Sequence, residues 1–251
     1  MVTIAKMEFA SFRPINTFIK TATLDGNQTL RVAKDPAVTE VDEPTFAKLV
    51  DSDFKNGIIE VRVLSKLLAN APDYARGFIG IAFRIDENNS KFEGIYIRPT
   101  NGRADDQLRR NRSTQYFSHP DFKFDRLRNE SSGMYESYAD MGLNEWIKIK
   151  IEIKDEKAKL YLNESSQPVL VVNDLKHGAD SSGGIGLWID IGTDGYFADL
   201  RIKKERAFRK ASAPTYYFSL ITFYFFRPYP CLLINRSILC RASSILLYSV
   251  A

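Results

Sequence analysis

The chain has 251 residues, of which 44% are hydrophobic and 26% are charged, and its formal net charge is +4. This length suits one large all-β domain or two small domains, and the composition is that of an ordinary globular protein. Six basic residues and no acidic residue follow Glu205, and removing these six charges from +4 leaves residues 1–205 at about −2. Nucleic-acid-binding proteins present a basic stripe, so no nucleic-acid partner is expected for this near-neutral body.

The cysteines and the terminal segments bear on whether the protein is disulfide-rich, secreted or membrane-spanning. Both cysteines, Cys231 and Cys240, lie near the C-terminus, so no disulfide framework is predicted for the body. The first eight residues lack a basic segment followed by an apolar one, so the sequence as written has no signal peptide and predicts a cytoplasmic protein. The longest apolar run, at 216–226, is shorter than the ~18 residues that span a bilayer, and no transmembrane segment is expected.

Strand signals strengthen along the first hundred residues. Residues 24–27 read Leu-Asp-Gly-Asn, which predicts a tight turn because Asp-Gly readily adopts positive φ. A short alternating strand follows at 29–34, and residues 43–50 predict one or two helical turns. A strand is then predicted at 58–64, because Ile59, Val61 and Val63 face one way and Glu60 and Arg62 the other, as in a strand with one buried face.

Two strands at 77–85 and 92–99 form the most informative stretch. One face of each carries isoleucine and phenylalanine, which predicts the core side. The other face carries Gly80, Ala82 and Gly94 among arginines and a tyrosine. Small residues let a ligand approach the backbone closely, so this face is predicted to form the floor of a groove.

The second half of the chain continues in short strands. Residues 100–134 are predicted to be a long polar loop with one short strand at 115–117, and 146–153 alternates most cleanly, with isoleucines inward. Further strands are predicted at 158–162, 169–172, 183–190 and 196–202. Many short strands with frequent turns predict an all-β fold, a two-sheet antiparallel β-sandwich of jelly-roll type.

The composition changes after residue 205. Residues 206–251 contain no glycine and no acidic residue, and neither helix nor strand periodicity runs through them. We therefore expect one domain at 1–205 and an unstructured or poorly packed tail at 206–251, such as a read-through extension. The alternative is a tail that associates with a membrane or a partner.

Several short motifs follow one another along the chain in a characteristic order: Phe54-Lys-Asn-Gly, Gly77-Phe-Ile-Gly, Tyr96-Ile-Arg-Pro, Glu145-Trp-Ile-Lys and Gly184-Ile-Gly-Leu-Trp. Together they resemble the concanavalin A-like lectin/glucanase superfamily, above all its laminin G-like members and domains of the 3-keto-disaccharide hydrolase type. The resemblance covers residues 20–202 and implies a sandwich whose concave face often holds carbohydrate. The Glu-x-Asp-x-x-Glu motif of the laminarinase-type hydrolases has no match here, which argues against transferring their mechanism.

Strand alternation assembles polar and aromatic side chains on the face opposite the core. Aromatic rings stack on pyranose rings, and charged groups form directional hydrogen bonds to hydroxyls. Arginines in the loop after residue 100 suit an anionic or hydroxyl-rich ligand. The predicted ligand-binding residues are Arg62, Arg84, Tyr96, Arg98, Asn101, Arg103, Gln115, Trp188 and Asp190. The alternative is a solvated face laced with cross-strand salt bridges.

Three functions follow as hypotheses. The first is a lectin-like module that binds an oligosaccharide or polysaccharide without catalysis. The second is a glycoside hydrolase-like enzyme that uses Glu60 or Glu136 as acid/base, since this chemistry needs two carboxyl groups. The third is a structural or protein-interaction sandwich. Asp190 and Asp194 have a loop spacing that suits calcium, no other cofactor is expected, and the oligomeric state is left open.

Overall fold

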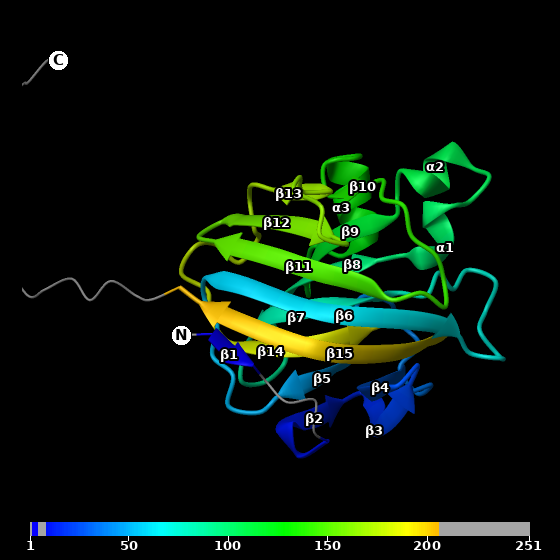
Figure 1. The fold of residues 1–251 in the computed structure, drawn as a ribbon. Helices are drawn as coiled ribbons and strands as arrows, with labels where there is room; N and C mark the ends of the chain where they lie inside the picture. The colour runs from blue at the N-terminus through cyan, green and yellow to red at the C-terminus, as the bar shows by residue number, and fades with distance from the viewer. Residues whose placement is uncertain (1, 5–8, 206–251) are drawn as a thin grey trace, which may run out of the picture. The chain divides into compact units, whose positions relative to one another are not determined.

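The computed structural model describes residues 2–4 and 9–205 (Figure 1). It confirms the all-β fold, with two antiparallel sheets packed face to face. The tail expected at 206–251 lies outside the described residues. Within the described residues, no helix is both long and apolar enough to cross a membrane.

The front layer in Figure 1 is an eight-stranded sheet in the order β13-β12-β11-β6-β15-β4-β3, with β1 pairing beside β15. Its strands are β1 (Val2–Ile4), β3 (Thr17–Leu24), β4 (Asn27–Lys34), β6 (Gly57–Leu67), β11 (Ile147–Lys154), β12 (Lys157–Leu162), β13 (Leu170–Val172) and β15 (Thr193–Lys204). The alternation predicted for β11 is confirmed, because Ile147, Ile149 and Ile151 are buried while the residues between them are partly exposed.

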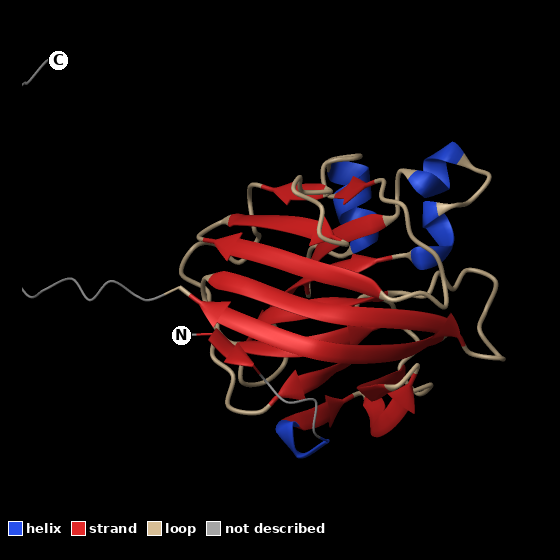
Figure 2. Cartoon of the chain, viewed as in Figure 1, coloured by secondary structure: helices blue, strands red, loops and turns tan. Residues whose placement is uncertain are grey.

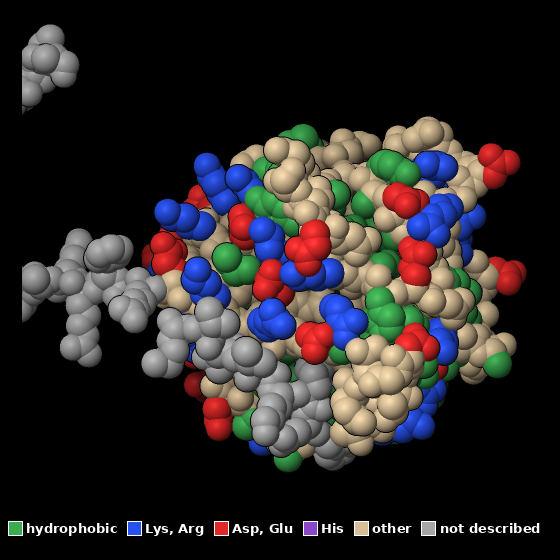
Figure 3. Space-filling model, in the orientation of Figure 1, with side chains coloured by type: hydrophobic (Ala, Val, Ile, Leu, Met, Phe, Trp, Pro, Cys, Tyr) green, Lys and Arg blue, Asp and Glu red, His purple; other side chains and the backbone are tan. Residues whose placement is uncertain are grey.

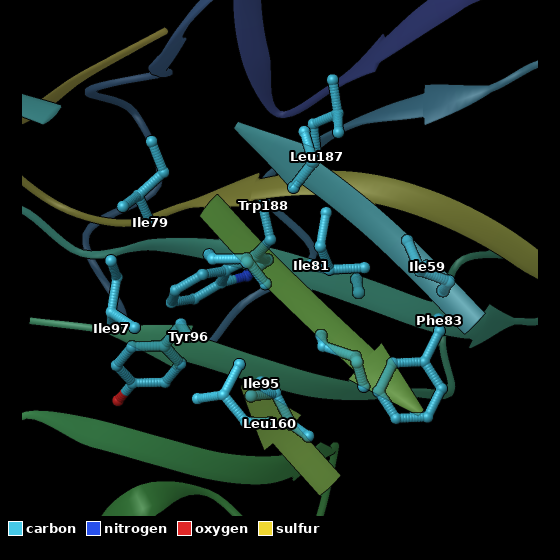
Figure 4. Packing of buried hydrophobic residues seen from close by; sticks show 14 of the residues in the cluster. Ile59, Ile79, Ile81, Phe83, Ile95, Tyr96, Ile97, Leu160, Leu187 and Trp188 are labelled. Atoms are coloured by element: carbon cyan, nitrogen blue, oxygen red, sulfur yellow. The ribbon is translucent and has the colours of Figure 1, made fainter. Parts of the chain in front are cut away.

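Behind it lies a seven-stranded sheet in the order β10-β9-β8-β7-β14-β5-β2. Its strands are β2 (Phe12–Ile15), β5 (Phe46–Leu49), β7 (Ile79–Ile85), β8 (Phe92–Ile97), β9 (Thr114–His119), β10 (Glu136–Ser137) and β14 (Gly184–Ile189). Side chains from the facing sides of both sheets, such as Ile59, Ile81 and Leu160, form one apolar core (Figure 4). Their burial supplies most of the driving force for folding.

The short helices are η1 (Phe9–Ser11), α1 (Pro99–Gly102), α2 (Gln107–Arg110) and α3 (Phe124–Glu130). The last three lie between β8 and β10 in the chain and gather at one side of the sandwich (Figure 2). The stretch 100–134, predicted as a loop with one short strand, therefore holds three helices and β9. The helical turns predicted at 43–50 were wrong, because β5 pairs with β2 and β14, and pairing with remote strands overrides local preference.

The outer side of the seven-stranded sheet carries a second apolar layer. Trp188, Tyr96 and Phe117 point away from the core side, since they alternate with core residues along their strands. Their ring centroids lie 4.7 Å (Tyr96–Trp188), 5.1 Å (Phe117–Trp188) and 5.6 Å (Tyr96–Phe117) apart. Only 1% of Trp188 and 2% of Tyr96 is exposed, so something must cover this layer.

The cover consists of the connection at 36–45 and helix α3. The indole Nε1 of Trp188 donates to the carbonyl of Glu43 at 2.9 Å. The backbone amide of Phe124, the first residue of α3, donates to the Asp42 carboxylate at 2.8 Å. The connection thus contacts the sheet on one side and the helix on the other.

Candidate ligand-binding site

A pocket of about 270 Å³ opens beside the carboxyl end of β8, where the cover ends. Its walls come from the connection at 36–45, the segment before β7, the α1–α2 region and α3. Arginines, aromatic rings and carboxyl groups dominate the lining: Arg76, Arg98, Arg109, Arg112 and Arg128; Tyr74, Phe78, Tyr96 and Phe124; Asp42 and Asp190. Five guanidinium groups against two carboxyls mark the pocket as electropositive.

Glu136 on β10 holds three of these arginines. Its Oε1 lies 3.1 Å from Nη1 of Arg98 and 2.5 Å from Nη2 of Arg128, and its Oε2 lies 3.7 Å from Nε of Arg112. The hydrogen bond from Arg128 to this carboxylate raises the pKa of Arg128. One buried carboxylate therefore orients three guanidinium groups, and this cluster keeps a net positive charge.

Arg98 forms the floor of the pocket. Its Nη2 donates to the Tyr96 hydroxyl at 2.9 Å and to Oε1 of Gln115 at 3.0 Å. Burial raises the pKa of Tyr96 well above that of a free phenol, so the ring stays neutral. A guanidinium held by three side chains is fixed in place before any ligand arrives.

Two carboxyl groups form the opposite wall. Asp190 accepts from Nζ of Lys34 at 2.5 Å and from the backbone amide of Asp42 at 3.0 Å. Asp42 is buried, and burial first, then the negative charge of Asp190, raises the pKa of its carboxyl to about 7. Asp42 therefore changes protonation in the neutral pH range.

No protein-family model matches the sequence, and no curated protein matches it. Solved structures do match. The carbohydrate-binding module CBM66 from Bacillus subtilis shares 11% identity over 76% of this chain and 97% of its own, with a TM-score of 0.44. Domain 4 of AbnA, a GH43 extracellular arabinanase from Geobacillus stearothermophilus in complex with arabinotriose, shares 13% identity over 81% of both chains, with a TM-score of 0.41.

A Bacillus subtilis protein of unknown function with a galectin-like fold shares 11% identity over 81% of this chain and 98% of its own, with a TM-score of 0.47. The structure of this chain itself shows a two-sheet antiparallel β-sandwich. At these identities and scores the likeness concerns the arrangement of sheets and carries no information about a ligand.

Four predicted ligand-binding residues come together in the pocket: Tyr96, Arg98, Asn101 and Asp190. Gln115 lies behind them as a partner of Arg98. Trp188 lies beneath the cover and offers no free ring face for stacking on a sugar. The predicted set is therefore split, with its useful part at one end of the sheet.

Arg84 corrects the expected parity of β7. The ladder to β14 shifts between Gly184 and Ile185, and Arg84 adopts a φ of 54°, so a β-bulge ends the simple alternation there. The Arg84 side chain leaves the predicted face and donates to the carbonyls of Lys55 at 3.1 Å and Asp155 at 2.7 Å, and to other acceptors. Its role in the structure is to connect turns at the far end of the sandwich.

Glu60 and Arg62 lie on the other sheet, which corrects the single polar face that parity suggested. Both belong to β6, where Glu60 lies 3.5 Å from Lys148 and Arg62 donates to Asp199 at 2.6 Å. Parity along a strand cannot tell which of two layers the strand joins, and this was the source of the error. Glu60 and Glu136 therefore lie in different sheets.

Arg103 is exposed and lies outside the pocket lining. Its guanidinium bridges Asp140 at 2.8 Å and Glu145 at 3.1 Å. The backbone amide of Gly142 donates to the same Glu145 carboxylate at 2.6 Å. Arg103 thus anchors the loop before β11.

The glycines predicted to floor a groove make room for aromatic rings instead. A Cβ on Gly94 would lie 2.2 Å from Cε1 of Phe117, and one on Gly186 would lie 2.9 Å from Cγ of Phe46. Both distances are well inside van der Waals contact. The small residues admit rings of the protein's own second layer, and the open space lies further along, at the pocket.

The two aspartates suggested for calcium are each engaged by a cation. Asp190 pairs with Lys34, and Asp194 pairs with Nε of Arg31 at 2.5 Å. Within the described residues, no group of three His, Cys, Asp or Glu side chains is placed to hold a metal. A calcium site at Asp190 and Asp194 remains a prediction from the sequence.

Sequence reasoning missed Asp42, Arg76, Phe124 and Arg128. They come from three segments that lie far apart in the chain, and none sits in a local motif. Arg109 belongs to the arginine-rich loop whose affinity for anions the sequence did indicate. The excess of arginines in that loop pointed toward the pocket, as did the strand alternation that selected Tyr96 and Arg98.

Proposed function

We propose that the chain is a carbohydrate-binding module whose sugar site is the arginine-lined pocket. One observation carries this: aromatic and cationic side chains line the same pocket. The Tyr74 side chain is 55% exposed, and Phe78 and Phe124 are partly exposed. The volume of about 270 Å³ lies just below the ~300–1,000 Å³ typical of small-molecule sites, which suits one or two sugar rings.

Binding would use two kinds of contact. The exposed face of Tyr74 offers a plate for the apolar side of a pyranose. Guanidinium groups donate hydrogen bonds to ring hydroxyls in fixed directions, and Arg98 is already oriented by Tyr96, Gln115 and Glu136. A site prepared in this way loses little conformational freedom when the sugar binds.

A glycan array followed by isothermal titration tests the proposal. We expect Tyr74→Ala to weaken binding of the selected glycan by about 0.5–1.5 kcal/mol, the range for an aromatic contact. Phe18→Ala is the matched control, because Phe18 is 62% exposed on β3, outside the pocket lining, and should leave affinity unchanged. A chain that binds no glycan on the array would refute the proposal and favour a structural or protein-interaction role.

A glycoside hydrolase is the second candidate, because a carboxyl with a pKa of about 7 lies in the pocket. Asp42 in its protonated form has the property of a general acid, and Asp190 is the neighbouring carboxylate. This pair replaces Glu60 and Glu136, which lie on different sheets. The test measures the release of reducing sugar from a bound glycan. Release that is lost in Asp42→Asn while binding persists would establish the enzyme. Release that is unaffected by Asp42→Asn would exclude this pair of carboxyl groups.

A further inference from the structure

Three of the pocket's five arginines have a carboxylate partner, but they share it. Arg98, Arg112 and Arg128 all contact Glu136. Three positive charges against one negative charge leave this wall positive whether or not a ligand is present.

The carboxyl groups of the opposite wall do not offset this surplus. Asp190 is paired with Lys34 at 2.5 Å. Asp42 accepts a backbone hydrogen bond from Phe124 and, buried beside Asp190, holds its proton up to about neutral pH. The two carboxyl groups of the pocket therefore interact with Lys34 and with backbone amides, and neither neutralises an arginine of the opposite wall.

Arg76 and Arg109 line the pocket without any salt bridge to a carboxylate of residues 2–4 or 9–205. Nη1 of Arg76 donates to the backbone carbonyls of Asp73 and Ala75 at 2.6 and 2.9 Å. Nη2 of Arg109 lies 3.5 Å from Oδ1 of Asn101, and its buried Nε–H has no hydrogen-bond partner in the described part of the chain.

The two guanidinium groups also repel each other. Burial lowers the pKa of Arg76, and the charges of Arg109 and Arg98 lower it further. Arg76 and Arg109 line a neighbouring pocket of about 340 Å³ as well, so they stand between two open spaces. An oxyanion between them would relieve the repulsion and supply an acceptor for the unpaired Nε–H.

We propose that the site selects an acidic sugar, whose carboxylate or sulfate group is held by Arg76 and Arg109. The inference rests on the proposed carbohydrate-binding function and names the class of ligand. Planar guanidinium groups bind such oxyanions through paired hydrogen bonds, which a neutral hydroxyl cannot match. The aromatic wall at Tyr74 and Phe78 then receives the sugar ring that bears the charge.

The test compares sugars that differ in charge. Titrations of the full chain with trigalacturonate, with galactotriose and with a sulfated galactose trisaccharide separate carboxylate, neutral and sulfate ligands. We expect at least one acidic trisaccharide to bind roughly tenfold or more tighter than galactotriose, as charge-assisted hydrogen bonds allow, and to weaken with added salt. The stronger acidic ligand identifies which oxyanion is preferred.

Variants then locate the selectivity. Arg76→Gln with Arg109→Gln should remove roughly tenfold or more of the acidic sugar's affinity and leave galactotriose binding nearly unchanged. Arg110→Gln is the matched control, because Arg110 neighbours Arg109 on α2 but donates to the Tyr138 hydroxyl and does not line the pocket. It removes one charge and should change affinity by less than about twofold.

Three outcomes overturn the inference, and they are distinguishable. Equal binding of acidic and neutral trisaccharides, with both weakened in Tyr74→Ala, defeats anion selectivity and keeps the sugar site. Acidic-sugar affinity that falls equally in Arg110→Gln shows attraction by surface charge alone. If the chain binds neither these sugars nor any glycan of the array, the proposed carbohydrate-binding function itself is wrong.

Discussion

The outer face of one sheet is open to solvent, whereas the outer face of the other is covered by protein. Strands of both sheets nevertheless direct every second side chain into the same core. Basic and acidic side chains lie interspersed on the outer face of the eight-stranded sheet (Figure 3). They pair across strands, as in Lys148 with Glu60 and Arg62 with Asp199. On the seven-stranded sheet, Trp188 and its aromatic neighbours are buried under the connection at 36–45 and α3. The solvated face is covered by no other segment of the described chain. On the covered face, a pocket forms at the edge where the covering segments end.

The chain's two tryptophans give the sharpest contrast between these faces. Trp188→Ala should lower the free energy of unfolding by about 3–5 kcal/mol, because it empties a buried site in the second apolar layer. Trp146, the residue immediately before β11, is partly exposed, with Nε1 3.2 Å from Asp25 and Arg62 over its ring, so Trp146→Ala should cost about 1 kcal/mol or less. Urea unfolding of both variants measures this. Equal losses would show that the covered face is no more tightly packed than the open one.

Two glutamates extend the comparison to charge. Glu136→Gln should cost about 3 kcal/mol, because it leaves three partly buried arginines without their shared carboxylate. Glu60→Gln, on the solvated face, should cost less than about 1 kcal/mol. If the Glu136 variant is as stable as the Glu60 variant, the arginines do not depend on Glu136. Chemical unfolding at fixed salt is the measurement.

The last expected effect is a pH dependence confined to the covered face. The folded pKa of Asp42, about 7, lies above its unfolded value, so the native state binds more protons between roughly pH 4 and 7. Stability should therefore fall as pH rises through this window and level off above it. Asp42→Asn keeps an acceptor for the amide of Phe124 and should flatten the slope. An unchanged slope in that variant would assign the titration to another group.

Strand positions were largely predictable, because a half-buried strand must alternate. The strand predicted at 146–153 is observed as β11, and the one at 29–34 lies within β4. Assignment to a sheet was not predictable, since alternation in β6 looks the same in either layer. The bulge at Arg84 could not be predicted either, because it arises from mismatch with β14, about 100 residues further along the chain.

The pocket was predictable only in part. Tyr96 was found because it lies in a strong strand and Arg98 because it follows that strand, and the arginine-rich loop revealed its chemistry by composition alone. Asp42 and Phe124 were missed because their importance comes from one contact between segments 82 residues apart. Trp188 was assigned to a groove because its parity was right, but a segment with no strong local pattern covers it.

The bulge at Arg84 also bears on how this protein can change over time. Its side chain ties together turns at Lys55, Asp155 and Gly178, about 20 Å along β7 from the pocket by strand geometry. The Arg84 contacts and the loops around the pocket thus occupy opposite ends of the sandwich. Exchange of the pocket loops should leave the Arg84 contacts intact, so the lining of the pocket can change without loss of the fold.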